Sequence, residues 1–237
     1  MVFRRIRWAL AMLGILLLIA CGLFFLSKSR SFQVFGKLVT RVETDQKRIA
    51  LTIDDGPTER TGAILSTLKE LDIPATFFVC GNSLEDRPED AKAIVQAGHA
   101  LGNHTYSHQR MVLVSYEFCK QEIEDTNRLI REAGYNGTIY FRPPNFKRLF
   151  VLPWYLHNAG ITTVLADVEP ETALGFDAPS QDLAVYMVEH ASGGSILLAH
   201  AMYNENSLEA IRLAVPQLKA QGYTFITVDQ LIEGEAS

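Results

Sequence analysis

Two adjacent aspartates, Asp54 and Asp55, have the types and the position in this 237-residue chain that best fit a chemical role. They follow an apolar run at residues 49–53, which predicts a short buried strand, and Gly56-Pro57 then predicts a turn. Because side chains alternate in direction along a strand, the two neighbours are expected to differ in role. At the end of the strand, one carboxylate could bind a metal ion while the other faces a substrate.

Two histidines four residues apart, His104 and His108, could share that metal ion. On a helical turn this spacing places both imidazoles on one face, and Asp55 is the natural carboxylate to complete the set. Two histidines and one aspartate leave open positions for water and a substrate. Thr105 stands where the zincin motif requires glutamate, which disfavours a protease of that type.

Short apolar runs alternate with helical periodicity from residue 49 onward, which predicts parallel βαβ units with right-handed crossovers. About seven strands are predicted, at residues 49–53, 75–80, 99–104, 139–142, 161–168, 195–200 and 223–228. Helices are predicted at residues 58–71, 88–97, 115–133, 149–159, 180–191 and 207–220, with Ser115 and Ser180 as caps. A barrel and an open doubly wound sheet both fit this order. In either fold, functional residues gather at the carboxyl ends of the strands.

The unusual polar residues of the chain fall at these strand ends. They are Asp54 and Asp55 after the first strand, His104 and His108 after the third, Arg142 and Asn145 after the fourth, Asp167, Glu169 and Glu171 around the end of the fifth, and His200 at the end of the sixth. This placement is harder to explain by chance than any single motif, so one shared site is predicted.

A family resemblance rests on four ordered segments: T-I-D-D-G-P at 52–57, H-T-Y-S-H at 104–108, R-P-P at 142–144 and L-A-H at 198–200. They resemble the motifs of the polysaccharide deacetylase family, also called the NodB homology or carbohydrate esterase 4 family. The resemblance covers about residues 48–230. It implies a distorted (β/α) barrel with about seven parallel strands and one divalent metal ion, zinc first, with cobalt or manganese as alternatives.

The resemblance also implies roles for individual positions. The implied metal ligands are Asp55, His104 and His108, the implied catalytic residues are Asp54 as general base, Arg142 as its partner and His200 as general acid, and the implied substrate contacts are the backbone N–H of Asn145 and the side chain of Leu198 in an acetyl pocket. A metal-bound water becomes a competent nucleophile near neutral pH, a base can take its proton, and an acid can protonate the leaving amine. Acetate and a free amino sugar would result.

Two positions depart from the family pattern. Asn145 stands where an aromatic residue is usual, although a backbone donor survives that change. The aspartate that usually orients the catalytic histidine has no clear counterpart. Asp167, Glu169 or Glu171 could substitute for it, and the sequence leaves the choice open.

An apolar segment at residues 8–26 carries no charge and is about long enough to span a bilayer as a helix. Three arginines precede it, which predicts a cytoplasmic N-terminus and an extracytoplasmic domain. A retained signal anchor over residues 1–30 is the first interpretation. A cleaved signal peptide and a lipoprotein signal with Cys21 as the lipidated residue are alternatives. Residues 31–48 are predicted as a linker and residues 49–237 as the deacetylase domain.

Charge and composition narrow the class of partner. Residues 1–30 carry +5 of a total charge of −5, so the remainder carries −10, which argues against nucleic acid. Cys80 and Cys119 match no zinc-motif spacing and are predicted to be buried free thiols. Glu122 and its acidic neighbours are interpreted as a solvated helix face.

Together these features predict a membrane-anchored, metal-dependent deacetylase that acts outside the cytoplasm on N-acetylated amino sugars of an envelope polysaccharide. Peptidoglycan is the first candidate, with chitin oligomers or an exopolysaccharide as alternatives. An O-acetyl esterase on the same scaffold, a catalytically silent carbohydrate-binding module and a metal-dependent amidase are the competing hypotheses.

Overall fold

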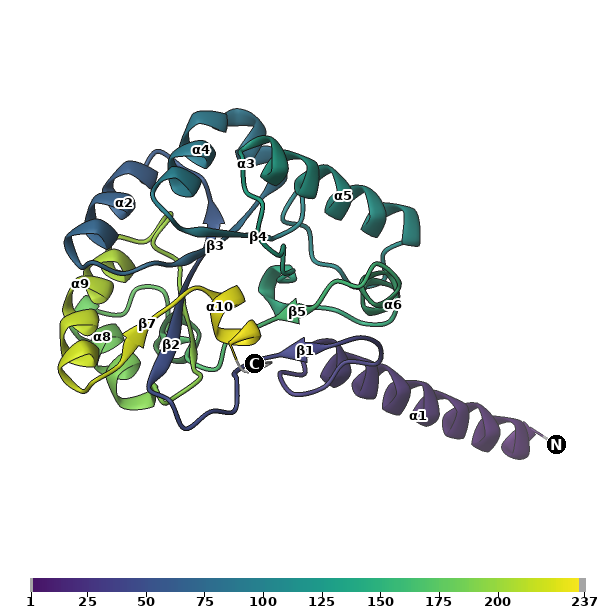
Figure 1. Cartoon of the computed structure of the whole chain (residues 1–237). Coiled ribbons are helices and arrows are strands. Elements are labelled where there is room, and N and C mark those ends of the chain that lie inside the picture. Colours follow the sequence, from purple (N-terminus) through teal and green to yellow (C-terminus); the bar gives the residue numbers. More distant parts are fainter. Residues whose placement is uncertain (1, 235–237) are drawn as a thin grey trace.

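A curved, parallel β-sheet forms the centre of the computed structural model, which describes residues 2–234 (Figure 1). Its strands are, in spatial order, β4 (Ala100–Asn103), β3 (Thr76–Val79), β2 (Arg48–Gly56) and β6 (Ile196–Ala199), with β7 (Thr224–Phe225) paired to the first residues of β2. All of these pairings are parallel. The long strand β2 is therefore the axis on which the other strands are assembled.

Single bridges carry the sheet from β4 around to β6 and make a distorted barrel, as predicted. These parallel bridges are Asn103–Phe141, Phe141–Thr163 and Val168–Leu197. The predicted strand at residues 139–142 is only one such bridge, because Pro143 and Pro144 follow directly and have no N–H to extend a ladder. The predicted strand at residues 161–168 is shortened to β5 (Thr163–Val164).

A strand that the sequence analysis did not predict lies within residues 31–48. This strand, β1 (Leu38–Val39), pairs in parallel with β5. The segment between the N-terminal helix and β2 therefore contributes directly to the barrel wall.

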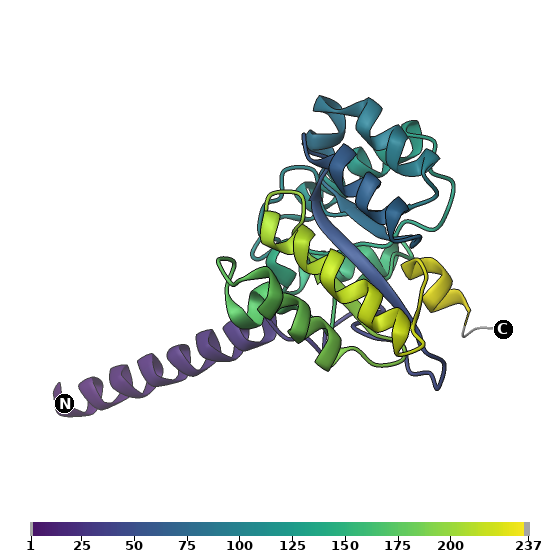
Figure 2. The same ribbon diagram turned by 90° about the vertical axis from the view of Figure 1, so that its left-hand side faces the viewer.

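Helices surround the sheet, and Figure 2 shows α8 and α9 across the outer face of β2. The helices of the domain are α2 (Thr61–Glu70), α3 (Gly81–Asp86), α4 (Pro88–Gln96), α5 (Tyr116–Glu132), η1, a 3-10 turn (Pro144–Phe146), α6 (Val151–Asn158), α7 (Pro170–Leu174), α8 (Ser180–His190), α9 (Glu205–Ala220) and α10 (Val228–Glu233). Ser115 caps α5 as predicted, since its hydroxyl accepts from the N–H of Phe118. The predicted cap Ser180 is wrong, because Pro179 holds the extended cap position and Ser180 is the first helical residue.

The alternating side chains of β2 serve two cores. Ile49, Leu51 and Ile53 are buried against the surrounding helices, whereas Ala50 packs inside the barrel with residues such as Leu198. Full burial of such aliphatic side chains stabilises the fold by about 1.5–3 kcal/mol each. The same alternation turns Thr52 and Asp54 toward the barrel interior. Cys80 and Cys119 are buried and free, as predicted.

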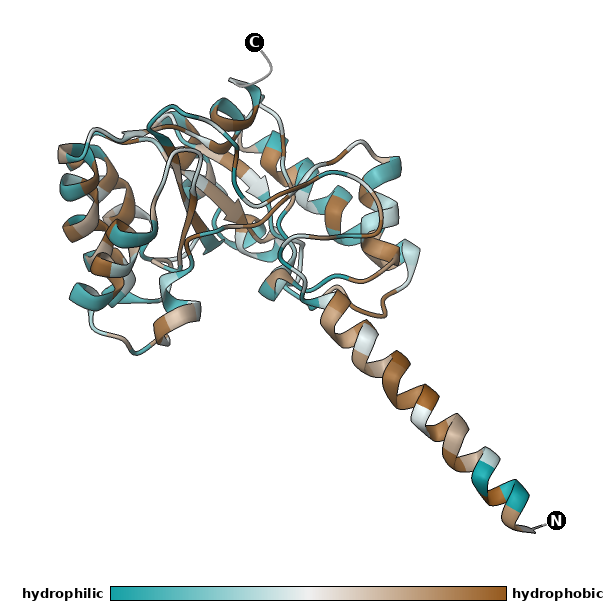
Figure 3. Ribbon diagram, turned by 90° about the horizontal axis from the view of Figure 1, so that it is seen from below, coloured by the Kyte–Doolittle hydropathy of each residue, from teal (hydrophilic) through white to brown (hydrophobic). Residues whose placement is uncertain are grey.

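The N-terminal helix α1 (Val2–Ser27) projects away from the domain (Figures 1 and 3). Its residues Phe3–Ser27 are long and apolar enough to cross a membrane. Figure 3 shows hydrophobic residues along most of its length and hydrophilic ones close to the N-terminus. The helix is therefore compatible with the predicted signal anchor.

His99 gives the fold a dependence on pH. The side chain is 7% exposed, and its Nδ1 accepts a hydrogen bond of 3.1 Å from the N–H of Ala75. Burial lowers the pKa of His99 to about 4. An unfolded histidine titrates near 6.5, so this stabilisation is fully present above about pH 6.5 and is lost as the pH falls toward about 4.

We expect His99→Gln to remove that part of the acid sensitivity. Between about pH 6.5 and 4, the free energy of unfolding of the wild type should fall by roughly 1.4 kcal/mol per pH unit more than that of the variant. Urea unfolding curves at several pH values measure this difference, with exposed His190→Gln as the matched control. Parallel pH dependences of the wild type and His99→Gln would contradict the assignment.

Candidate active site

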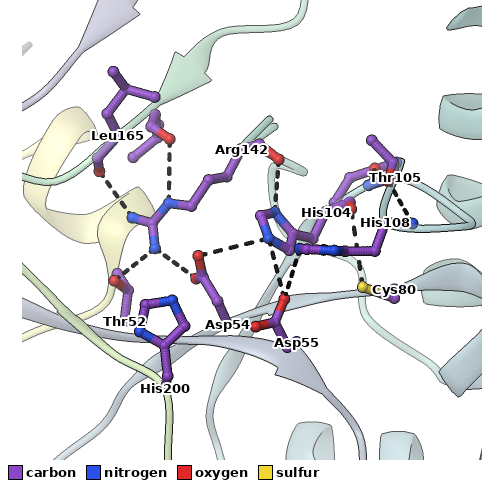
Figure 4. A network of polar contacts seen from close by, with 12 residues as sticks. Thr52, Asp54, Asp55, Cys80, His104, Thr105, His108, Arg142, Leu165 and His200 are labelled. Carbon is purple, nitrogen blue, oxygen red and sulfur yellow. Dashed lines mark hydrogen bonds and ion pairs between the residues drawn. The ribbon is translucent and has the colours of Figure 1, made fainter. Parts of the chain in front are cut away.

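Asp54 and Arg142 form a buried ion pair inside the barrel (Figure 4). Arg142 is fully buried, its Nη1 donates to Asp54 Oδ1 at 2.6 Å, and its guanidinium lies 3.9 Å from the centre of the Phe78 ring. Its other acceptors are Thr52 Oγ1 at 2.8 Å, Leu165 O at 2.8 Å and Val164 O at 3.3 Å. Burial lowers the pKa of Arg142, while the charge of Asp54 acts in the opposite direction. These contacts fix one edge of the Asp54 carboxylate.

Asp55 turns away from its neighbour and meets the two predicted histidine ligands. Its backbone φ is +71°, and the register of β2 shifts at this point. Asp55 Oδ1 lies 3.4 Å from His104 Nε2 and 3.0 Å from His108 Nε2, and potential ligand atoms of the three residues lie within 4.8 Å of one another. Burial alone would raise the pKa of Asp55, but the two imidazoles outweigh burial and lower it.

These three residues fit a divalent metal ion. Within the described part of the chain, buried Asp55 Oδ1 has no hydrogen-bond partner of good geometry. His104 Nδ1 lies 2.7 Å from the carbonyl oxygen of Arg142, so Nδ1 donates this hydrogen bond and Nε2 is the ring nitrogen that faces Asp55. A carboxylate oxygen and imidazole nitrogens that converge in this way are the usual ligands of zinc and related ions.

A loop, and not a helical turn, brings the two histidines together. Residues 104–108 form a loop in which Thr105 and His108 have φ values of +69° and +56°. Glu122 of α5 holds this loop, because one carboxylate oxygen accepts from the N–H groups of Tyr106 and Ser107, both at 2.9 Å. Glu122 is buried, so its interpretation as part of a solvated face is wrong.

His200 follows β6 and lies beside Glu171 of α7. Its Nδ1 is 3.7 Å from Glu171 Oε1, which is longer than a direct hydrogen bond. The same oxygen accepts from the backbone N–H of His200 at 3.0 Å and from Ser207 Oγ at 2.6 Å. Burial lowers the pKa of His200, but the carboxylates of Glu171 and Asp54 outweigh this effect and raise it overall.

Two of the three acidic residues that the sequence left open are engaged elsewhere. Asp167 accepts from Ser195 Oγ at 2.8 Å and from the N–H of Ile196 at 2.7 Å. Glu169 pairs with Arg30 at 2.9 Å. Glu171 is therefore the carboxylate placed to influence His200.

These groups surround one cavity of about 250 Å³. It is lined by Arg30, Asp54, Asp55, His104, His108, Asn145, Phe146, Glu169, Thr172, Phe176, Leu198, His200 and Tyr203. All of the predicted site residues except buried Arg142 line it, and Arg142 contacts it through Asp54. Sequence reasoning missed Arg30 altogether, because the residue lies outside every motif and shortly after an apolar helix. A larger hollow of about 680 Å³ beside α2 includes none of the predicted site residues.

Asn145 lies at this cavity in a left-handed conformation with φ of +51°. Asparagine adopts this conformation more readily than the aromatic residue usual at the position. Its side-chain Oδ1 accepts from Arg110 Nε at 2.9 Å. Its backbone N–H takes part in no hydrogen bond among the described residues, which leaves it available as a donor.

Comparisons with known proteins agree with this fold. Residues 41–164 match the family model described as polysaccharide deacetylase. The chain is 30% identical over 206 residues to a peptidoglycan-N-acetylglucosamine deacetylase of Bacillus cereus, and the match covers 80% of this chain and 70% of the relative. The chain therefore belongs to the polysaccharide deacetylase family, and the predicted enzyme class, a hydrolase that deacetylates carbohydrates, is confirmed.

Solved structures show the same fold. The crystal structure of the Bc1960 peptidoglycan N-acetylglucosamine deacetylase has a TM-score of 0.76 and 29% sequence identity, covering 82% of this chain and 92% of that one. BA3943 of Bacillus anthracis, a carbohydrate esterase 4 pseudoenzyme, has a TM-score of 0.75 and 26% identity, covering 84% and 70%. Because a pseudoenzyme shares the fold, the fold alone does not establish the roles of individual residues.

Proposed function

We propose that this protein is a membrane-anchored, metal-dependent N-deacetylase that acts on amino sugars of peptidoglycan outside the cytoplasm. The observation that carries the proposal is the convergence of a carboxylate base, an Asp-His-His ligand set and a histidine acid on one cavity of about 250 Å³. The likeness to a peptidoglycan-N-acetylglucosamine deacetylase of Bacillus cereus supports peptidoglycan as the substrate. The long apolar helix α1 supports the anchor.

Asp55, His104 and His108 would hold the metal ion, with zinc as the first candidate and cobalt or manganese as alternatives. When bound, the ion would polarise the acetamide carbonyl and lower the pKa of water, which supplies a nucleophile near neutral pH. The hydrogen bond from His104 to the carbonyl of Arg142 keeps the ring in the tautomer that such a ligand needs.

Asp54 and His200 would share the proton transfers. Arg142 occupies Oδ1 of Asp54, so Oδ2 remains for the proton of the attacking water. Amines leave poorly unless they are protonated, and His200 would supply that proton. The charge of Glu171 favours the protonated form of His200 that this step requires. The N–H of Asn145 would stabilise the oxyanion, and Leu198 would line the acetyl pocket.

Glu171→Gln tests the partnership with His200. Removing the carboxylate should lower the pKa of His200, because burial lowers this pKa and one of the negative charges that raise it would be gone. The basic limb of the pH dependence of kcat should move to lower pH, so activity falls more at high pH than at pH 6. Glu189→Gln, the same exchange at an exposed glutamate on α8, is the matched control. An unchanged basic limb in Glu171→Gln would contradict the role.

Acetate release by the full chain tests the function itself. The substrates are peptidoglycan and N-acetylglucosamine oligomers, and the protein is assayed as purified, after chelation, and after addition of zinc, cobalt or manganese. Acetate that vanishes on chelation and returns with metal is the expected result. Release that is indifferent to chelation would overturn metal dependence. No acetate from fully metal-loaded protein would favour a catalytically silent carbohydrate-binding module.

A further inference from the structure

Arg30 lies three residues after the end of α1, yet its side chain lines the cavity that holds the candidate catalytic residues. Its guanidinium stacks 4.3 Å from the centre of the Phe146 ring, and Nη2 donates to Glu169 Oε2 at 2.9 Å. These two contacts hold the planar group in one orientation at the wall of the cavity. Residue 30 is therefore part of the site, although the sequence places it at the end of the anchor.

Arg148 fixes the segment that carries Arg30. Arg148 is buried, and its backbone N–H donates to the carbonyl oxygen of Ser27 at 3.0 Å. Its side chain donates to Phe32 O at 3.0 Å and to Gln33 Oε1 at 3.1 Å. These bonds clamp the chain on both sides of Arg30 to the loop that follows η1. The position of Arg30 is thus set by the catalytic domain and not by a free linker.

The guanidinium of Arg30 still has donors to offer. Its side chain is 40% exposed, and within residues 2–234 its hydrogen bond to Glu169 uses Nη2 alone. The N–H groups on Nε and Nη1 donate no hydrogen bond among the described residues, so they could bind a ligand. A guanidinium edge of this kind matches the two oxygens of a carboxylate better than it matches the hydroxyl groups of a neutral sugar.

Three other cations lie near Arg30. Arg110 Nε donates to Asn145 Oδ1 at 2.9 Å on the cavity wall, Lys147 follows Phe146 in the chain, and Lys28 precedes Arg30 by two residues. This basic group stands out on a domain whose residues 31–237 carry −10. Such a cluster favours an anionic ligand.

Two of these cations, Lys28 and Lys147, contact the end of α1 and are not among the residues that line the cavity. Lys28 Nζ lies 4.5 Å and Lys147 Nζ 5.2 Å from the ring centre of Phe24, on the last turn of α1. That position suits the headgroup level of a membrane. Arg30 instead lines the cavity with the candidate acid and base, so its ligand is expected to be part of the substrate.

We propose that Arg30 is a substrate-binding residue that selects amino-sugar glycans bearing a carboxylate close to the acetamide. This inference rests on the proposed deacetylase function and narrows its substrate class. A neutral glycan would still reach the catalytic residues but would lack one charge-assisted contact. The residues that follow α1 would then contribute to substrate selection as well as to membrane attachment.

The test compares full-length wild type with Arg30→Gln in neutral detergent on two matched glycans. One is a peptidoglycan-derived oligosaccharide with free carboxylates, and the other is the same oligosaccharide with its carboxylates converted to methylamides. Arg30→Gln should raise KM for the first about 10- to 100-fold and for the second less than about 3-fold. The KM of Arg30→Lys for the first glycan should fall between the values of the wild type and Arg30→Gln. Lysine keeps the positive charge but lacks the planar pair of donors that a guanidinium offers. Arg128→Gln is the matched control, because it removes an exposed arginine that pairs with Glu132 on α5. It should leave KM unchanged for both glycans.

The possible results separate the alternatives. If Arg30→Gln raises KM equally for both glycans, Arg30 has only a structural role and the proposal is overturned. The proposal is also overturned if KM rises for neither glycan. If Arg30→Gln loses activity on both glycans, and only in vesicles of anionic lipid, Arg30 binds lipid phosphate and the proposal is overturned. If the wild type releases no acetate, the proposed function fails, but titration of Asp54→Asn and Asp54→Asn/Arg30→Gln proteins with the two glycans still decides whether Arg30 discriminates between them.

Discussion

Replacing Asp54 by asparagine should lower kcat for acetate release by about a hundred- to ten-thousandfold, the usual contribution of general acid–base catalysis. Asparagine has nearly the same shape as aspartate and still offers an oxygen to Nη1 of Arg142, but it cannot accept a proton from water. Sugar binding should remain nearly intact. Kinetic assays on metal-loaded protein and calorimetric titration with the oligosaccharide measure the two effects separately.

Metal content distinguishes Asp54 from its neighbour. Asp54→Asn should keep the metal stoichiometry of the wild type, whereas Asp55→Asn should reduce it, because Asp55 would supply a ligand atom. Asp182→Asn, the same exchange at an exposed aspartate on α8, should leave activity and metal content unchanged. Retention of more than about a tenth of wild-type kcat by Asp54→Asn would contradict the base assignment.

Strand periodicity explains why part of the site could be predicted from sequence. The alternation along β2 separates Asp54, which points into the barrel, from Asp55, and the βαβ order places the later motifs at the same end of the sheet. The positive φ of Asp55 and the register shift that turn its carboxylate toward His104 have no sequence signal of their own. The residue types could therefore be read from the sequence, but their directions could not.

Long-range contacts account for what the sequence analysis missed. The loop at residues 104–108 is held by Glu122 from a helix, so the spacing of the histidines gave a helical interpretation that the fold does not support. Glu171 was one of three equivalent candidates until the structure showed where the other two are engaged. Arg30 belongs to the site only because Arg148, more than a hundred residues away in the chain, binds its flanking segment. Local pattern carries no information on such pairs.

Arg142→Met should destabilise the domain by about 3–5 kcal/mol, since removing one partner of a buried ion pair leaves the other uncompensated. Asp54 is 2% exposed and would lose its 2.6 Å donor, and the acceptor at Thr52 would also be left without Arg142. Arg142→Lys should recover only part of this loss, because lysine cannot donate to several fixed acceptors at once. Urea unfolding of the full chain in detergent gives the free energies.

A double-mutant cycle separates the ion pair from the packing of Arg142 on Phe78. Asp54→Asn removes the charge that Arg142 compensates, so Asp54→Asn/Arg142→Met should cost less than the sum of the single changes, by about 2–3 kcal/mol. The exposed pair of Arg128 and Glu132, 2.9 Å apart, provides the matched cycle, and its coupling should stay below about 0.5 kcal/mol. Additive costs at the buried pair would show that Arg142 stabilises the barrel through its carbonyl and aromatic contacts alone. In that case its charge would be retained for the orientation of Asp54 and not for the fold.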